Sequence, residues 1–215
     1  MPTSRHSSAA PGEVEHLALA LANSAYVLPG HPWVDLLASR ASARRWLVEH
    51  DLDAPGKDVD SRASRLRELR AHVRSLLEAR SAGRPPPVDA VRATNAALRR
   101  APAWSRLEYD AQSGWRRGAW ADDDKSIDRA LAGIASDLLD LVTGPHAAFI
   151  RQCDAQRCGR FLLSTHAHRR FCSTRCANRA RSARAYARTH NREAAFADGG
   201  SGAVMPPRSR PLSVP

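Results

Sequence analysis

Residues 153–190 read CDAQRCGRFLLSTHAHRRFCSTRCANRARSARAYARTH, and this stretch decides how the C-terminal part of the chain folds. It contains all four cysteines, in the pattern Cys153-x4-Cys158-x13-Cys172-x3-Cys176. Two close pairs separated by a short span are typical of a tetrahedral zinc site, in which the intervening chain folds back as a hairpin. Four thiolates fill the coordination sphere, so the spacing predicts one structural Zn²⁺ with no open position for activating water.

Other uses of the four cysteines stay open at this point. Two disulfides are typical of exported proteins, but residues 1–16 lack the apolar core of a signal peptide, so we expect a cytoplasmic protein. An iron–sulfur cluster uses the same type of ligand. Either His166 or His168 could replace one cysteine, and the exposed tip of a hairpin is the alternative place for both.

A helix is predicted directly after Cys176, because the sequence there is rich in Ala and Arg and has no helix breaker. Cys172 and Cys176 would lie at its start, as in a treble-clef-like finger. Arg181, Arg184 and Arg188 then share one face of the helix, which predicts contacts with phosphates. A plain solvated face is the alternative.

The residues beside the second cysteine pair complete the predicted nucleic-acid-binding set. Asn178 and Arg179 can contact a base edge or a phosphate, or they can brace the turn that holds the zinc ligands. Arg169 and Arg170, just before Cys172, belong to the same predicted surface.

The charge distribution points to the same segment. The 215 residues include 33 Lys+Arg and 22 Asp+Glu, but residues 151–192 alone hold eleven Arg and one Asp. Residues 1–150 are nearly balanced. A GC-rich genome explains the use of Arg rather than Lys, but it does not explain this clustering, which predicts an anionic partner.

The rest of the chain predicts a mostly helical domain over residues 13–145, so the fold class is mainly α. The clearest signal is one apolar stripe at helical spacing in residues 61–82, and three Trp and one Tyr interleaved with polar residues predict a small β-hairpin over 104–120. The other predicted helices are 14–27, 35–51, 88–100 and 125–143, the last closed by Gly144–Pro145.

The domain organisation follows from these segments. Residues 1–12 are rich in Ser, Ala and Pro and are expected to be disordered, as is the tail over 193–215. The zinc finger is expected over 149–192. No run of 18 apolar residues occurs, so we expect no membrane span.

Catalytic motifs are absent from the sequence: it has no Ser-His-Asp motif, Gly-rich phosphate loop or HExxH, so we do not expect an enzyme. Asn23, His31 and Trp115 are the candidate residues of a ligand pocket for a small-molecule effector. The alternative is that the tryptophans of the hairpin belong to the core.

Residues 149–190 resemble the CGNR-type zinc finger, a bacterial family named after a Cys-Gly-Asn-Arg signature. Here the signature reads Cys176-Ala177-Asn178-Arg179, and it is preceded by RRFCS at 169–173. The preceding part resembles the helical ABATE domain, a family linked to stress-induced transcription regulation, through LALALANS at 17–24 and LRELR at 66–70.

Two positions depart from the family pattern. Ala177 stands where the family has Gly, which would strain the turn if this position needs a positive φ. Ala20 stands where the family usually has an acidic residue, so a bracing or ligand-binding role there would be lost. Neither position is a predicted zinc ligand.

The resemblance implies a bacterial transcription regulator that binds duplex DNA through the Arg-bearing helix. The helical domain would then sense a ligand or mediate dimerisation, and a homodimer is one expectation, because a single finger has a small footprint. The alternative is a zinc-stabilised module that binds RNA or an acidic protein surface without reading a DNA sequence.

Overall fold

The structure, a computed structural model, describes residues 9–27, 33–52, 59–101, 104–112, 114–120, 127–165 and 169–198. In chain order its helices and strands are α1 Leu17–Ala22, β1 Ala25–Val27, β2 Trp33–Asp35, α2 Arg40–Glu49, α3 Val59–Ser81, α4 Val88–Arg100, β3 Trp104–Asp110, β4 Gly114–Trp120, α5 Ile127–Thr143, the 3-10 helix η1 Pro145–Phe149, β5 Ile150–Gln152, β6 Phe161–Leu163 and α6 Thr174–Asp198. None of the described helices is both long and apolar enough to span a membrane.

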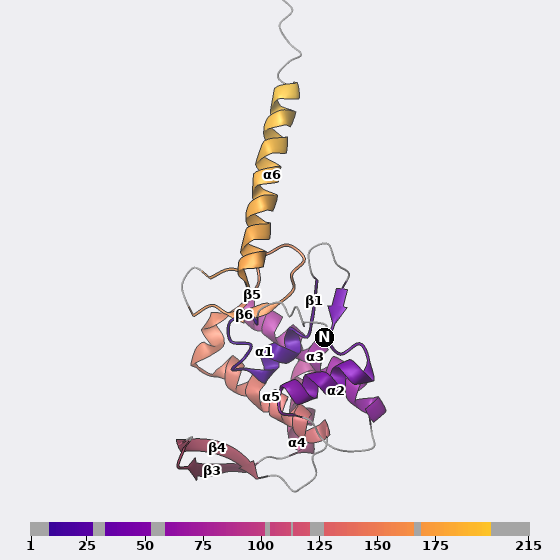
Figure 1. The fold of residues 1–215 in the computed structure, drawn as a ribbon, viewed down its shortest axis with the longest axis vertical. Coiled ribbons are helices and arrows are strands. Elements are labelled where there is room, and N and C mark those ends of the chain that lie inside the picture. Colours follow the sequence, from indigo (N-terminus) through magenta and orange to yellow (C-terminus); the bar gives the residue numbers. More distant parts are fainter. Residues whose placement is uncertain are drawn as a thin grey trace, which may run out of the picture.

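Helix α3 is the centre of the helical body, and α1, α2, α4 and α5 all pack against it (Figure 1). Its apolar stripe explains this position: Leu66, Val73 and Leu77 are completely buried. Trp46 from α2 and Ile134 from α5 fill the same core. Burying such side chains stabilises the body by roughly 1.5–3 kcal/mol each.

The predicted mainly helical fold is confirmed, and α3, α4 and α5 lie within about two residues of the expected ranges. The predicted helix over 14–27 is wrong at both ends, because α1 begins at Leu17 and stops at Ala22. There the Asn23 side chain bonds to the backbone of the distant Phe161, and the Ser24 hydroxyl donates to the carbonyl of Leu21. Residues 25–27 instead pair with 33–35 as an antiparallel ribbon.

The predicted helix over 35–51 begins later than expected, at Arg40. The Asp35 carboxylate accepts the N–H of Leu37, which forms a local turn in place of the first helical turn. Ser39 then caps α2 through a reciprocal pair of hydrogen bonds with Ser42.

The predicted hairpin is confirmed as β3 and β4, which pair from Trp104–Trp120 to Asp110–Gly114. It extends away from the helical body (Figure 1). Trp115 is 71% exposed and lies against Tyr109, with ring centroids 4.8 Å apart. A core position for Trp115 is therefore wrong; the alternation of aromatic and polar residues shows a strand but does not show what covers it.

The finger and the helical body share one core. Ile150, Phe161 and Leu163 from β5 and β6 belong to the same apolar cluster as α1, α3 and α5. The expected disorder of residues 1–12 is wrong for 9–12, because Ala10 is buried against the cysteines and Pro11 accepts the N–H of Leu163. Residues 1–8 lie outside the described part of the chain.

The expected tail over 193–215 is also corrected at its start, because α6 continues to Asp198. Uninterrupted helix-favouring residues from Glu193 to Ala197 explain the extension. Residues 199–215 lie outside the described residues.

Candidate metal centre and nucleic-acid interface

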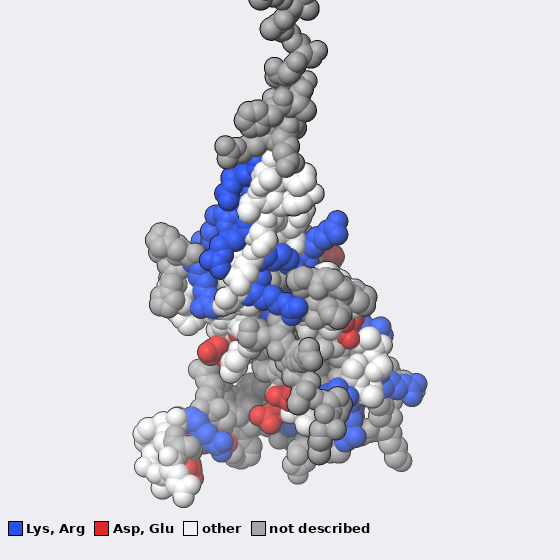
Figure 2. All heavy atoms as spheres, turned by 45° about the horizontal axis from the view of Figure 1, so that its top comes forward, with Lys and Arg blue, Asp and Glu red and all other residues white. Residues whose placement is uncertain are grey.

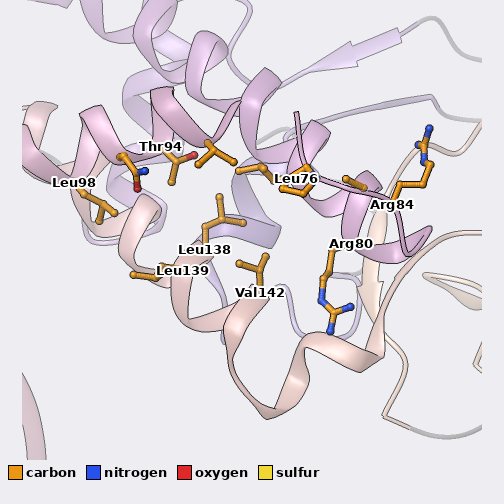
Figure 3. Close-up of a pocket in the computed structure, with 12 residues that line it drawn as sticks. Leu76, Arg80, Arg84, Thr94, Leu98, Leu138, Leu139 and Val142 are labelled. Atoms are coloured by element: carbon orange, nitrogen blue, oxygen red, sulfur yellow. The ribbon is translucent and has the colours of Figure 1, made fainter. Parts of the chain in front are cut away.

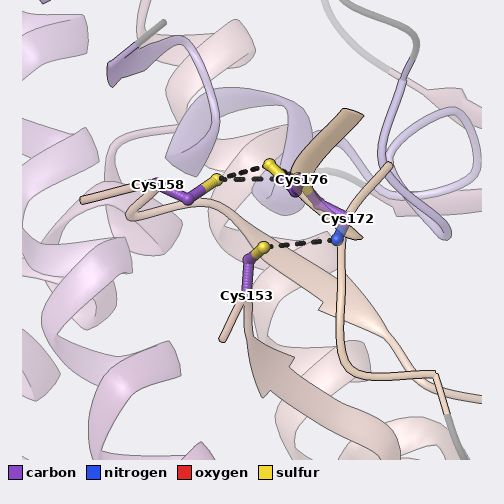
Figure 4. A group of neighbouring side chains, drawn as sticks. All are labelled: Cys153, Cys158, Cys172 and Cys176. Atoms are coloured by element: carbon purple, nitrogen blue, oxygen red, sulfur yellow. Dashed lines mark hydrogen bonds between the residues drawn. The ribbon is translucent and has the colours of Figure 1, made fainter. Parts of the chain in front are cut away.

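The β5–β6 hairpin and the start of α6 bring the four cysteines together (Figure 4). Cys153 and Cys158 lie in the turn between the two strands, where Gly159 has a φ of +68° that favours glycine. Cys172 lies two residues before α6, and Cys176 lies in its first turn. This is the treble-clef-like order that the sequence predicts.

The sulfur atoms have the spacing of a tetrahedral metal site. The Sγ atoms of Cys158, Cys172 and Cys176 lie 3.5–3.6 Å apart in pairs, and all four ligand atoms lie within 4.8 Å of one another. A tetrahedron with Zn–S bonds of about 2.3 Å has edges of about 3.8 Å, which these distances approach. Three of the cysteines are buried and Cys176 is partly buried.

The closely packed thiols perturb one another's pKa. Hydrogen bonds from the neighbouring thiols lower the pKa of Cys153, and the same bonding together with burial raises the pKa of Cys158 to about 11. Zinc binding releases the thiol protons, because the metal ligands are thiolates. The donor set and the spacing hold one structural zinc ion, with no ligand position left open.

Hydrogen bonds from surrounding backbone and side-chain groups hold the cysteines in place. The N–H of Cys172 donates to the Sγ of Cys153 over 3.4 Å, and the N–H of Cys176 donates to the Ser173 hydroxyl. Arg179 donates to the carbonyl of Gln156 over 2.9 Å and lies 4.0 Å from the Sγ of Cys176. The structure therefore supports the bracing interpretation of Arg179.

The departure at Ala177 carries no strain. Ala177 lies in the first turn of α6, where its N–H donates to the carbonyl of Ser173, and the described non-glycine residues with positive φ are Asp51 and Arg157. Ala20 is buried in the core on α1. Position 20 therefore contributes an apolar side chain to the core.

Beyond the zinc site, α6 projects from the rest of the molecule (Figure 1). Every residue from Arg181 to His190 is exposed, including Arg184 and Arg188. Figure 2 shows basic side chains along one side of this helix and around its base, with uncharged residues along the other side. The structure thus brings Arg181, Arg184 and Arg188 onto one accessible face.

The other predicted DNA-contact residues differ in whether they already bond to residues of the protein itself. Asn178 accepts a hydrogen bond from Arg181 on the same helix. Arg170 forms an ion pair of 2.6 Å with Asp154, whose N–H donates to the carbonyl of Arg170. Arg169 is exposed next to this pair. All three lie at the base of α6.

The structure does not bring Asn23 and Trp115, two of the three residues of the expected ligand pocket, together. Asn23 is 1% exposed, and its amide is used by backbone groups of the finger. Trp115 is on the projecting hairpin, away from Asn23. His31 lies outside the described residues.

Sequence reasoning missed a polar joint between the helical body and the finger. The Asn23 amide accepts the N–H of Phe161 and donates to its carbonyl, as a neighbouring strand would. Arg74 on α3 donates to the carbonyls of Ala22 and Gly159 over 2.7 and 2.8 Å. Burial lowers the pKa of Arg74, and it also lies over the Phe161 ring.

A buried ion pair completes the joint. The Arg160 guanidinium, in the turn after Cys158, lies 2.5 Å from the Glu13 carboxylate and over the ring of Tyr26. Glu13 also accepts from the Asn23 amide and from the N–H of Ala10. Asn23 and Ser24, the polar pair directly after the apolar LALALA run at 17–22, are the sequence signal that could have indicated this joint.

Comparison with protein families identifies both parts of the chain. No curated protein matches it. The model of the ABATE family, described as "Putative stress-induced transcription regulator", matches residues 15–145, and that of the CGNR zinc finger matches residues 150–189. The chain therefore belongs to the ABATE family and carries a CGNR zinc finger that binds one structural zinc ion.

Proposed function

We propose that the protein is a cytoplasmic transcription regulator that binds duplex DNA through α6. The observation that carries the proposal is the accessible face formed by Arg181, Arg184 and Arg188 on a helix that the zinc site holds at its base. Among the described residues, none of these three arginines has an acidic partner, so their charges are available to phosphates.

The shape of α6 also fits this partner. A single α-helix enters the major groove of B-DNA, and the exposed helix leaves its outer turns free to do so. Arg181 and Arg188 lie seven residues apart, so they span roughly 10 Å along the helix axis at about 1.5 Å per residue. Most of the affinity is then electrostatic, with few contacts that read the sequence.

The protein is proposed to act by binding rather than by catalysis. Four thiolates close the zinc site, so it has no position at which water could be activated. The family description supports a role in the response to stress. The helical body would sense an effector or mediate dimerisation, since one finger covers only a short DNA site.

The test is selection from a random duplex-DNA library on the zinc-loaded full chain at near-physiological salt. We expect an enriched motif, and a palindromic motif would indicate a dimer. Replacing the three face arginines together by Ala should abolish enrichment and reduce the slope of log affinity against log salt by about 2 to 3.

A matched variant controls for net charge. Arg45, Arg92 and Arg99 are exposed arginines of the helical body, and replacing them by Ala removes the same charge. Equal losses in the two variants would show binding by overall charge alone and would overturn the proposal. Preference for double-stranded RNA over the same duplex in DNA would favour the RNA-binding alternative instead.

A further inference from the structure

An apolar groove lies between α3, α4 and α5, on the helical body and away from the zinc site (Figure 3). Its volume is about 290 Å³. This is near the lower end of the range for small-molecule sites, and such sites are mostly apolar with a few polar groups that orient the ligand.

The groove is elongated along α4. Its residues on that helix run from Val91 to Leu98, which lie seven residues apart and therefore span roughly 10 Å. Leu138, Leu139 and Val142 of α5 form the facing wall. The Thr94 hydroxyl in this wall donates to the carbonyl of Ala90, so it offers no free donor to a ligand. Asn95 is the other polar residue of α4 in the lining, and the remaining lining of α4 and α5 is aliphatic. A mostly apolar groove of this length fits an aliphatic chain.

One end of the groove is basic. Arg80 and Arg84 lie at the end opposite Leu98 (Figure 3). Arg84 forms an exposed ion pair of 3.1 Å with Glu78, and such pairs contribute little stability. Arg80 is exposed and forms no ion pair with any residue that the structure describes. Its guanidinium can therefore take a carboxylate through two parallel hydrogen bonds.

We propose that this groove binds a medium-chain aliphatic carboxylate, with the chain along α4 and α5 and the carboxylate on Arg80. The positive charge at one end and the mostly apolar walls along the rest favour an amphipathic anion over a neutral or cationic molecule. The site lies apart from α6, so the inference does not depend on DNA binding.

The test is calorimetric titration of octanoate into the zinc-loaded full chain, with 1-octanol and octylammonium as probes of equal chain length. We expect octanoate to bind at one site, and octanol to bind about tenfold or more weakly, because it lacks the charge-assisted hydrogen bonds. Octylammonium should be the weakest of the three, since its charge is repelled by Arg80.

Two substitutions of exposed residues distinguish binding of the ligand's carboxylate from binding of its aliphatic chain. Arg80→Gln should weaken octanoate about tenfold and leave octanol unchanged, whereas Leu139→Glu should weaken both. The matched controls are Arg99→Gln on α4 and Leu107→Glu on the hairpin, because both residues are exposed and neither lines the groove. These controls should bind octanoate like the parent protein.

Three results would overturn the proposal. Absence of octanoate binding would show that the groove takes no such ligand. Equal affinities for the three probes, or an unchanged octanoate affinity in Arg80→Gln, would show that the groove is apolar but does not recognise an anion. A dimer that dissociates in the Leu139→Glu variant during sedimentation would show that a second copy covers the groove.

Discussion

Helices α3 and α6 have similar lengths and the same number of arginines, but they use these arginines in opposite ways. They contain 23 and 25 residues, with six arginines each. On α3, Arg70 is 8% exposed and bonds to Asp35 and Ser24, while Arg74 bonds to two backbone carbonyls. On α6, Arg184 and Arg188 extend into solvent.

The difference teaches that the number of arginines in a helix does not show whether they are accessible, whereas their partners in the structure do. A carboxylate and backbone carbonyls from distant segments hold Arg70 and Arg74 of α3, so these two arginines stabilise the fold. The described part of α6 has no such neighbours after Ala180, so its exposed arginines are accessible to the proposed DNA partner. Arg179 marks the boundary, because it is on α6 but braces the zinc site.

The largest expected effect is that of Cys172→Ser, which removes one zinc ligand at the base of α6. Structural zinc contributes about 10–16 kcal/mol in small zinc fingers, so the finger should unfold. The sequence alone suggests that residues 14–145 would then stay folded. The structure changes this expectation, because Phe161 and Leu163 lie in the common core.

We therefore expect the helical body of this variant to lose stability as well. Zinc analysis, circular dichroism and limited proteolysis measure the two parts separately. A melting curve of the helical body that matches the parent protein would show that the two parts fold independently.

The next largest effect is expected for Arg74→Met on α3, whose free energy of unfolding can be compared with that of Arg188→Met on α6. Arg74→Met leaves the carbonyls of Ala22 and Gly159 without their donor, and we expect a loss of about 2–3 kcal/mol. Arg188→Met should change the free energy of unfolding by less than about 0.5 kcal/mol, because its side chain is exposed. Denaturant unfolding of both variants measures this difference, and equal losses would show that α6 is packed in solution.

The ion pair between Asp35 and Arg70 should make stability depend on pH. Hydrogen bonds from Arg70 lower the pKa of Asp35, so its contribution is complete above the usual Asp pKa and is lost as pH falls through the lowered value. Asp35→Asn should cost about 2 kcal/mol near neutral pH.

The gap in unfolding free energy between this variant and the parent should stay constant above about pH 5 and shrink below about pH 4. Unfolding curves measured across this pH range provide the test. A gap that grows as the pH falls would contradict the assigned role of the ion pair.

The smallest effect on stability is expected for Arg184→Ala, which should leave the melting temperature unchanged and lower the salt slope of DNA binding by about one. Binding measured at several salt concentrations gives the slope. If the slope stays at the parent value, Arg184 does not contact the phosphate backbone.

The sequence predicts those parts of the structure that depend on local patterns. The apolar stripe of α3 and the spacing of Cys153, Cys158, Cys172 and Cys176 are visible without a fold, because helical period and ligand chemistry act over short distances. The joint was not predictable, because Asn23 finds its partner 138 residues away. Likewise, the aromatic pattern around Trp115 shows a strand but not the absence of a covering surface.

The attachment of α6 at one end has a consequence for its helix–coil equilibrium. Starting a helix is costly, whereas extending one is close to balanced, and the zinc ligands Cys172 and Cys176 fix the first turn. Zinc thus supplies the nucleus, while the outer turns depend on intrinsic propensity. Replacing the exposed Ser182 by Ala, a change of about 0.5 kcal/mol in propensity, should therefore strengthen DNA binding by reducing the entropy lost on ordering the helix.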